Sequence, residues 1–221
     1  MINSIEDIKK FINEKNFKKI FILCGKKSFL NSGAEPIFKE ISNLKKVKLF
    51  YKNSELPILE ELIEIIKDIR NFGPDLILAI GGGTIMDYAK IANVVDIRPD
   101  LAKLIENYSY PFKKKYSHLA AIPTTAGSGA EVTSNAVIYV NGIKHSFESD
   151  LLIPDNFFLV PEFIISAPHK IKASAGFDAI AQALESLVSK KSNDQSIDYA
   201  VESLKVSTNS YINFLNDPNL K

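Results

Sequence analysis

The chain has 221 residues, of which 46% are hydrophobic, and 27 Lys and Arg against 26 Asp and Glu leave a formal net charge of +1. This length provides one full domain and part of another, and the near-zero charge gives no argument for binding nucleic acid or an anionic membrane. No apolar run approaches the roughly 20 residues of a membrane span, and Glu6 and Asp7 stand where a signal peptide would be basic and then apolar. We therefore expect a cytoplasmic protein without a membrane or nucleic-acid partner.

Cysteine and histidine are scarce in this chain. Cys24 is the single cysteine, so an internal disulfide is excluded, and its apolar surroundings in the sequence favour a buried, unreactive thiol. The three histidines, His118, His145 and His169, include no pair at the i, i+4 spacing of a helical zinc site. A metal site made of this chain's histidines alone is not expected.

The first part of the chain alternates helical and strand-like segments. Apolar residues at helical spacing in 4–15 precede an apolar run at 19–24, and a second helix reaching Ile41 precedes a strand-like run at 47–51. This pattern predicts a β-α-β arrangement after the first helix.

Segment 57–70 has the pattern of an amphipathic helix that covers a sheet. Five aliphatic residues fall on one stripe while charged residues fall on the other side. Pro57 fits its first turn, and Gly73 fits its end. Strands and helices that alternate in this way predict a parallel, doubly wound α/β sheet, in which ligands bind at the carboxyl ends of the strands.

A glycine turn ends the most apolar strand, at 76–80. Residues 81–83 are all glycine, and the segment after them has helical apolar spacing. Because these residues lack Cβ, the backbone can approach a ligand closely, and the unpaired N–H groups of the new helix favour a phosphate or pyrophosphate. A tight turn without a ligand explains the glycines equally well, and Met86 stands where the G-x-G-x-x-G fingerprint needs its third glycine.

A second loop with polar hydroxyls follows the next strand. Segment 93–116 has no strong periodicity and is interpreted as a short helix and a surface loop, before a buried strand at 119–122. The residues after this strand, 123–129, are small, hydroxyl-bearing or glycine, and present donors to a phosphate or ribose. A solvated loop has the same composition, so this segment alone leaves both interpretations open.

Beyond that loop the sequence predicts a hairpin. Segments 136–140 and 143–147 flank Asn141-Gly142, which favours a type I′ turn, so we expect an antiparallel flap over the parallel sheet. A last short strand is expected at 157–160, closed by Pro161.

The final part of the chain is helical in character. Ser166 fits a helix cap and Pro168 an early helical position, and helices are expected over 170–190 and from about 193 to 215. Two amphipathic helices cannot bury their apolar stripes by themselves. We therefore expect them to pack on the first domain, on absent sequence, or on another chain, as a homo-oligomer or with a missing C-terminal portion.

Three motifs, in this order, resemble those of the iron-containing (group III) alcohol dehydrogenases. The run 81–90, GGGTIMDYAK, is similar to the family's GGGS-x-x-D-x-x-K signature, and 122–133, IPTTAGSGAEVT, resembles its second cofactor motif. The run 175–185, AGFDAIAQALE, resembles the helix that carries the family's first metal ligands. The resemblance implies a Rossmann-like dinucleotide-binding α/β domain over 1–162 and the beginning of an all-helical metal and substrate domain over 163–221, as in the dehydroquinate synthase-like fold.

The resemblance further implies a nicotinamide dinucleotide lying across the first domain, with its pyrophosphate at the glycine turn. The implied cofactor contacts are Gly81, Gly82, Gly83, Thr84, Asp87, Thr124, Thr125, Ser128, Asn135 and Lys144. The residue types agree with this role, because a helix N-terminus favours an anion, hydroxyls donate hydrogen bonds and a lysine balances negative charge. Lys144 considered alone also fits a solvated surface lysine.

The choice between NAD and NADP often depends on the residue after the second strand. A carboxylate there accepts the ribose hydroxyls and repels a 2′-phosphate. The family often has Asp at this place, whereas Lys52 aligns with it here, followed by Asn53 and Ser54. We hypothesise a preference for NADP(H) over NAD(H), with an exposed lysine of no special role as the alternative.

The implied metal site departs from the family pattern. Asp178 matches the first ligand of Asp-x-x-x-His, but Gln182 stands where the first histidine belongs, and the family's two later histidines would lie beyond Lys221. Residues i and i+4 share a helix face, so both side chains are expected to point to one place. Because an amide oxygen is a poor ligand for Fe or Zn, Gln182 leaves open a three-ligand site, a supporting role, or a lost metal. Asp178 and Gln182 are the candidate catalytic residues, and Asp178 is the candidate metal ligand.

The resemblance implies an NAD(P)-dependent alcohol dehydrogenase or aldehyde reductase, in which a metal polarises a small aldehyde while the nicotinamide delivers a hydride. The run 177–186 also resembles the phosphonoacetaldehyde reductase branch, which has glutamine at this place, and favours a phosphonoacetaldehyde-type substrate. One alternative is a dehydroquinate synthase-like or glycerol dehydrogenase-like enzyme, although the residues at 125–131 favour the alcohol dehydrogenases. The other is a truncated or decayed chain that binds dinucleotide without turnover.

Overall fold

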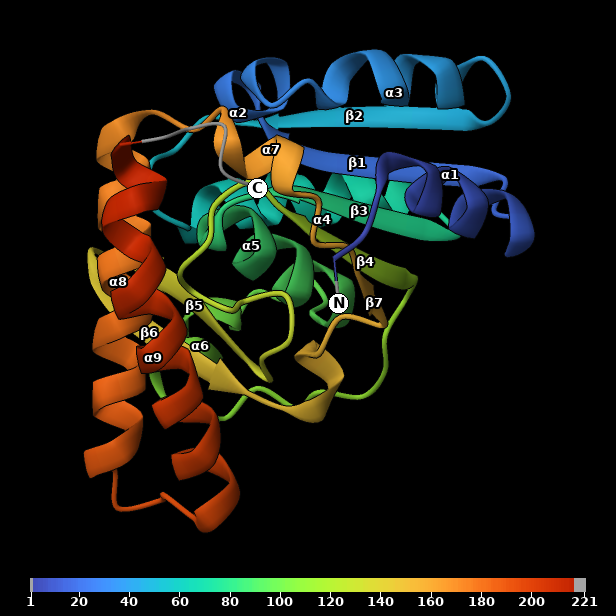
Figure 1. The fold of residues 1–221 in the computed structure, drawn as a ribbon. Helices are drawn as coiled ribbons and strands as arrows, with labels where there is room; N and C mark the ends of the chain where they lie inside the picture. The colour runs from blue at the N-terminus through green and yellow to red at the C-terminus, as the bar shows by residue number, and fades with distance from the viewer. Residues whose placement is uncertain (1, 217–221) are drawn as a thin grey trace.

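The computed structural model describes residues 2–216 of the chain. Five parallel strands form the main sheet in the order β2-β1-β3-β4-β7, and β5 and β6 pair separately as an antiparallel hairpin (Figure 1). The strands are β1 (Lys19–Gly25), β2 (Lys46–Lys52), β3 (Leu76–Gly81), β4 (His118–Pro123), β5 (Asn135–Val140), β6 (Ile143–Glu148) and β7 (Asn156–Phe157). The predicted α/β class with a parallel sheet and a hairpin is confirmed.

Helices cover both faces of the sheet, because successive side chains of a strand point to opposite sides. Leu76, Leu78 and Ile80 of β3 pack in one core cluster with the buried residues of α1, α2 and α3, while Ile77 and Ala79 pack in the other with those of α4, α5 and α6. These helices are α1 (Ile5–Glu14), α2 (Lys26–Asn31), α3 (Ala34–Ser42), α4 (Leu59–Phe72), α5 (Gly83–Val94) and α6 (Leu101–Glu106). Because β3 faces a core cluster on each side of the sheet, it is apolar along its whole length.

The hairpin has the predicted turn but packs against a different part of the domain than expected. Asn141 and Gly142 both have positive φ, 52° and 77°, as a type I′ turn requires. The buried residues of the hairpin, among them Ile138 and Phe147, join the core on the α4 and α5 side. The flap therefore packs chiefly on the helix layer, against α5, and not directly over the sheet.

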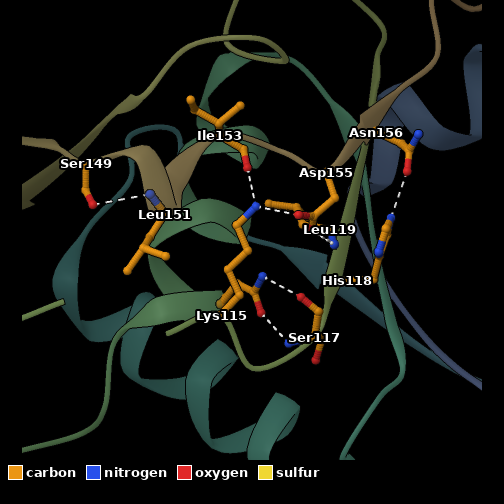
Figure 2. Close-up of polar contacts among 10 residues, drawn as sticks. Lys115, Ser117, His118, Leu119, Ser149, Leu151, Ile153, Asp155 and Asn156 are labelled. Atoms are coloured by element: carbon orange, nitrogen blue, oxygen red, sulfur yellow. Dashed lines mark hydrogen bonds and ion pairs between the residues drawn. The ribbon is translucent and has the colours of Figure 1, made fainter. Parts of the chain in front are cut away.

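The segment that returns from the hairpin passes the short helix η1 (Asp150–Leu152) and is fixed at the amino end of the sheet. Figure 2 shows Lys115 directed at Asp155, with 2.6 Å between Nζ and Oδ1, while Oδ2 of Asp155 accepts the Leu119 N–H at 2.8 Å. Nε2 of His118 lies 2.8 Å from Oδ1 of Asn156. These contacts align the two-residue strand β7, shorter than the expected 157–160, with β4.

Three helices complete the described chain: α7 (Pro161–Ile165), α8 (His169–Val188) and α9 (Asp194–Asn216). Ser166 is the C-cap of α7 and Pro168 is the N-cap of α8, so the predictions of Ser166 as the N-cap and of Pro168 in the first turn of the long helix are wrong. Similarly, Pro57 lies just before the cap of α4 and not in its first turn.

Helices α8 and α9 pack on each other and stand as a pair at one side of the α/β part (Figure 1). Several of their large apolar side chains remain exposed: Phe177, Leu184, Val188, Tyr199, Val206 and Ile212. The two helices thus leave part of their apolar stripes uncovered within residues 2–216, as the pattern predicted, while the division at residue 162 remains a prediction. None of the helices in the described part of the chain has the length and apolarity to span a bilayer.

Candidate functional site

The carboxyl ends of three neighbouring strands meet at one edge of the sheet. Gly81 at the end of β3 pairs with Pro123 at the end of β4, and Ile80 pairs with Cys24 near the end of β1. The N–H of Thr124 donates to the Gly81 carbonyl at 3.0 Å. The glycine turn and the hydroxyl loop, which are 40 residues apart in sequence, are therefore side by side, as expected for a doubly wound sheet.

At each glycine of the turn, a side chain would meet a neighbouring residue. A Cβ on Gly81 would lie 2.6 Å from Cγ1 of Ile85, so a side chain at this position would force Ile85 to shift. A Cβ on Gly82 would lie 3.1 Å from Oγ1 of Thr125, and one on Gly83 would lie 3.4 Å from Oγ of Ser128. The two hydroxyls thus face the start of α5, where the backbone N–H groups have no side-chain cap. This N-terminus combines donors and a favourable dipole for an anion.

A pocket of about 360 Å³ opens at this edge. Its polar lining includes Lys27, Ser28 and Asn31 of α2 together with Gly82, Thr124 and Thr125. Its apolar lining includes Phe163 of α7 and Ile171 of α8. The glycine and hydroxyl residues of this pocket were predicted from the sequence. The contributions of α2, α7 and α8 were not, because only the strand order shows that β1 is the neighbour of β3.

Lys52 does not lie next to the strand that ends in the glycine turn. It ends β2, which pairs with β1 and is separated from β3 by it. Its Nζ donates to the carbonyl oxygens of Ser54 and Glu55, and burial lowers the pKa of this lysine. The ammonium group is thus directed at its own loop, and Lys52 does not line the pocket described above.

That loop is held in shape by Glu61. Its carboxylate accepts the N–H groups of Asn53 and Ser54, at 2.5 and 3.0 Å, and the Tyr88 hydroxyl at 3.0 Å. Burial alone would raise the pKa of Glu61, but a hydrogen bond from the Ser54 hydroxyl, together with these three, outweighs it and holds the pKa below its usual value. Tyr88 is a residue of α5, so the loop after β2 is tied to the helix of the glycine turn.

On the other side, α5 is tied to the hairpin. Nζ of the fully buried Lys90 donates to the Thr133 carbonyl at 2.8 Å, the Thr133 hydroxyl at 3.0 Å and the Asn135 carbonyl at 3.0 Å. Burial lowers the pKa of Lys90 to about 8. Burial also raises the pKa of Asp87 to about 6, although Lys90, the Val137 N–H and the exposed Lys144 act in the opposite direction. Thr84 is half-buried in the first turn of the same helix.

Asp178 and Gln182 do lie together on α8. Both are exposed, and Nε2 of Gln182 donates to Oδ2 of Asp178 at 2.8 Å. Over residues 2–216, no three His, Cys, Asp or Glu side chains gather as a metal would need. One carboxylate and one amide do not make a metal centre, so the residues present do not fit an iron or zinc ion, and we derive no metal-dependent step from them.

The helix that carries this pair is closely packed on the hydroxyl loop. A Cβ on Gly127 would lie 2.3 Å from the carbonyl oxygen of Ala175. Asp178 is only three residues further along α8, less than one helical turn. The contact between the loop and Ala175 therefore also positions Asp178 relative to the loop.

A parallel sheet with a glycine turn, a hydroxyl loop and a pocket at its carboxyl edge is typical of the dinucleotide-binding α/β proteins. The family model for iron-containing alcohol dehydrogenase matches residues 2–161. The chain belongs to the iron-containing alcohol dehydrogenase family, as its resemblance predicted, and the first two of the three motifs lie within the matched residues.

Individual relatives agree with this membership. The chain is 30% identical to the 4-hydroxybutyrate dehydrogenase of Clostridium kluyveri, over 96% of this chain and 58% of that protein. It is also 30% identical to aldehyde-alcohol dehydrogenase 2 of Entamoeba histolytica, over 87% of this chain and 24% of that protein. The solved structure of sulfoacetaldehyde reductase from Bifidobacterium kashiwanohense in complex with NAD⁺ is 26% identical, with a TM-score of 0.89, over all of this chain and 59% of that one. The chain thus spans less than two thirds of each of these relatives.

Proposed function

We propose that this chain is the dinucleotide-binding part of an NAD(P)-dependent oxidoreductase that interconverts a small aldehyde and its primary alcohol. The observation that carries the proposal is the meeting of the glycine turn and the hydroxyl loop at the start of α5, in a member of this family. When bound, the nicotinamide supplies or accepts the hydride. The chain's own residues bind and orient the cofactor.

The proposed binding mode follows from the residues at the carboxyl ends of β1, β3 and β4. The pyrophosphate meets the N-terminus of α5, with the hydroxyls of Thr125 and Ser128 as donors. The pocket beside it has the mixed lining of a nucleoside site, because Phe163 and Ile171 offer apolar surface to a base while Ser28 and Asn31 offer hydrogen bonds to a ribose. Asn135 and Lys144, on the hairpin side, are proposed to contact the nicotinamide half.

For the cofactor we propose NADP(H) in preference to NAD(H). In doubly wound sheets the carboxylate that selects NAD follows the strand next to the glycine-turn strand. Here that strand is β1, which ends at Gly25 and is followed by Lys26 and Lys27, without an acidic side chain. Lys27 lines the pocket, whereas the ammonium of Lys52 is engaged by carbonyl groups. We therefore assign the attraction for a 2′-phosphate to Lys27 more than to Lys52.

For the substrate we propose an aldehyde that carries an anionic group, of the phosphonoacetaldehyde type. The similarity of residues 177–186 to the phosphonoacetaldehyde reductase branch supports this, as does the likeness to a structure of a sulfoacetaldehyde reductase. Catalytic roles for Asp178 and Gln182 remain proposals. So does the association of α8 and α9 with a second copy or with further helical sequence, which their exposed apolar residues support.

One observation favours a second candidate function, binding of dinucleotide without turnover. The donor set around Asp178 in the described residues is incomplete for a metal. Such a chain would bind NADPH but leave the aldehyde unreduced.

The test is a titration of the purified 221-residue chain with NADPH and with NADH, followed by nicotinamide fluorescence. We expect saturable binding with the tighter Kd for NADPH. Lys27→Glu should weaken NADPH far more than NADH, whereas Lys52→Glu, the matched control, should change neither greatly. Tighter binding of NADH by the wild-type chain would refute the NADP(H) preference, and no binding of either would refute the cofactor site.

Turnover is measured on the same protein by NADPH absorbance with phosphonoacetaldehyde and, separately, a simple aldehyde such as propanal. Oxidation of NADPH by propanal but not by phosphonoacetaldehyde would overturn the substrate proposal. Tight NADPH binding without oxidation by either aldehyde, with and without added Fe²⁺ or Zn²⁺, would favour the binding-only function.

A further inference from the structure

Lys90 is a buried cation whose partners all belong to one short segment. Its side chain is 0% exposed, and the three oxygens that its Nζ contacts, at 2.8 to 3.0 Å, come from Thr133 and Asn135. A buried ammonium is costly unless hydrogen bonds satisfy its three donors. Here all three are satisfied by the segment that enters β5.

Asp87 faces the same strand from the same side of α5. It lies three residues before Lys90, so the two side chains share a helix face, and the N–H of Val137 on β5 is near enough to its carboxylate to lower its pKa. Both residues thus face the segment 133–137, and the hydrogen bonds of Lys90 hold it.

Apolar packing alone would not fix this position so closely. Ala136, Ile138 and Phe147 bury the inner face of the hairpin in the core, but such contacts are non-directional and tolerate a small slide of one element along another. Hydrogen bonds from one ammonium to three oxygens require a single register, because each bond weakens steeply with distance and angle.

We propose that Lys90 is a positioning residue, which sets the hairpin β5–β6, and with it Asn135 and Lys144, relative to the glycine turn at the other end of α5. This inference rests on the proposed function, in which the turn holds the pyrophosphate and the hairpin the nicotinamide half. One rigid helix then sets the distance between the two halves of the cofactor site.

The test compares whole and half ligands on Lys90→Met, which keeps the length and burial of the side chain but removes the ammonium. We expect NADPH to bind about tenfold more weakly, while adenosine 2′,5′-bisphosphate, which reaches only the α5 turn side, binds within a factor of two of wild type. A general loss of structure would weaken both ligands alike, so equal weakening of the two, or unchanged NADPH binding, would overturn the proposal.

Two further variants keep the test decisive. Thr133→Val removes only the hydroxyl partner of Lys90 at nearly constant shape. It should weaken NADPH binding relative to adenosine 2′,5′-bisphosphate, but by less than Lys90→Met does. This variant replaces Lys90→Met in the test if Lys90→Met does not fold. Because the chain contains no tryptophan and Ile143 on the hairpin is 63% exposed, Ile143→Trp supplies a fluorescent reporter. Its anisotropy should fall when Lys90→Met or Thr133→Val is added, with no ligand present, and an unchanged anisotropy would overturn the positioning role. If the wild-type chain binds neither nucleotide, the proposed function fails while the reporter still decides this inference.

Discussion

Replacing Gly83 by alanine separates a ligand-binding role of the glycine turn from a purely structural one. The added Cβ would lie 3.4 Å from Oγ and 3.6 Å from Cβ of Ser128, which are acceptable contacts, and Gly83 is not among the glycines with positive φ. Since Gly83 is the first residue of α5, alanine is favoured there by at most about 1 kcal/mol through helix propensity. We expect the free energy of unfolding to stay the same or rise slightly.

The effect on binding should be large. The new methyl group stands beside the Ser128 hydroxyl, at the helix N-terminus where the pyrophosphate is proposed to sit. Loss of one hydrogen bond to a charged group is worth about 1.5–3 kcal/mol, which corresponds to roughly a ten- to hundredfold weaker Kd. We therefore expect Gly83→Ala to fold like wild type and to bind NADPH at least tenfold more weakly.

The assay combines urea unfolding, followed by circular dichroism, with a fluorescence titration of NADPH. Gly81→Ala is the matched control for a structural glycine, because its Cβ would lie 2.6 Å from Ile85 and overpacking of this kind costs about 1–3 kcal/mol of stability. If Gly83→Ala keeps both its stability and its affinity for NADPH, the turn serves only to join strand and helix, and the anion site is refuted.

Three further changes test the surroundings of the site. Burial raises the pKa of Asp87 from 3.8 to about 6, so the protonated carboxyl group stabilises the folded chain. This contribution to the free energy of unfolding is complete below pH 3.8 and is lost as the pH rises through 6. In urea unfolding the free energy should therefore fall by at most about 3 kcal/mol between those pH values, and this fall should be absent in Asp87→Asn. Arg70→Met should cost about 1–3 kcal/mol in the same assay, since Nη2 of Arg70 binds two carbonyl oxygens at the end of α5, and an unchanged midpoint would contradict that role. Asp155→Ala should speed amide hydrogen exchange at Leu119, whose N–H it accepts at 2.8 Å, whereas full protection there would show that β7 needs no such support.

The fold followed from the sequence because its signals are periodic and local. Residues 76–80 of β3 are apolar without interruption, which requires helices on both faces, and the structure divides them between two cores. Asn141-Gly142 specified its turn because few residue pairs accept two positive φ values. Each of these features depends on neighbours in the chain, and so could be predicted from one sequence.

The site followed less completely because it depends on strand order. The residue that selects NAD or NADP was expected after the second strand of the sequence, which is β2, and this led to Lys52. In space the neighbour of β3 is β1, and the residue in the pocket is Lys27. Lys90 was visible in the motif, but its contacts with 133–135 cross 43 to 45 residues of chain and have no local signal.

Asp178 and Gln182 on α8 are joined by a single hydrogen bond. The i, i+4 spacing of Asp178 and Gln182 predicted a shared face, and their 2.8 Å hydrogen bond agrees with it. Since both side chains are exposed, that bond is worth only about 0.5–1 kcal/mol, far less than the roughly 10–16 kcal/mol that a completed zinc site releases. The amide of Gln182 therefore cannot by itself keep a metal away from Asp178. Within residues 2–216, what opposes a metal is the number of donors, because one carboxylate without two or three further ligands gains too little to order an ion. A histidine at position 182 would add one ligand and still leave the set short, so Gln182→His alone should not give the chain saturable binding of Zn²⁺ in calorimetry. Stoichiometric Zn²⁺ binding by Gln182→His, abolished by adding Asp178→Asn, would refute this reasoning.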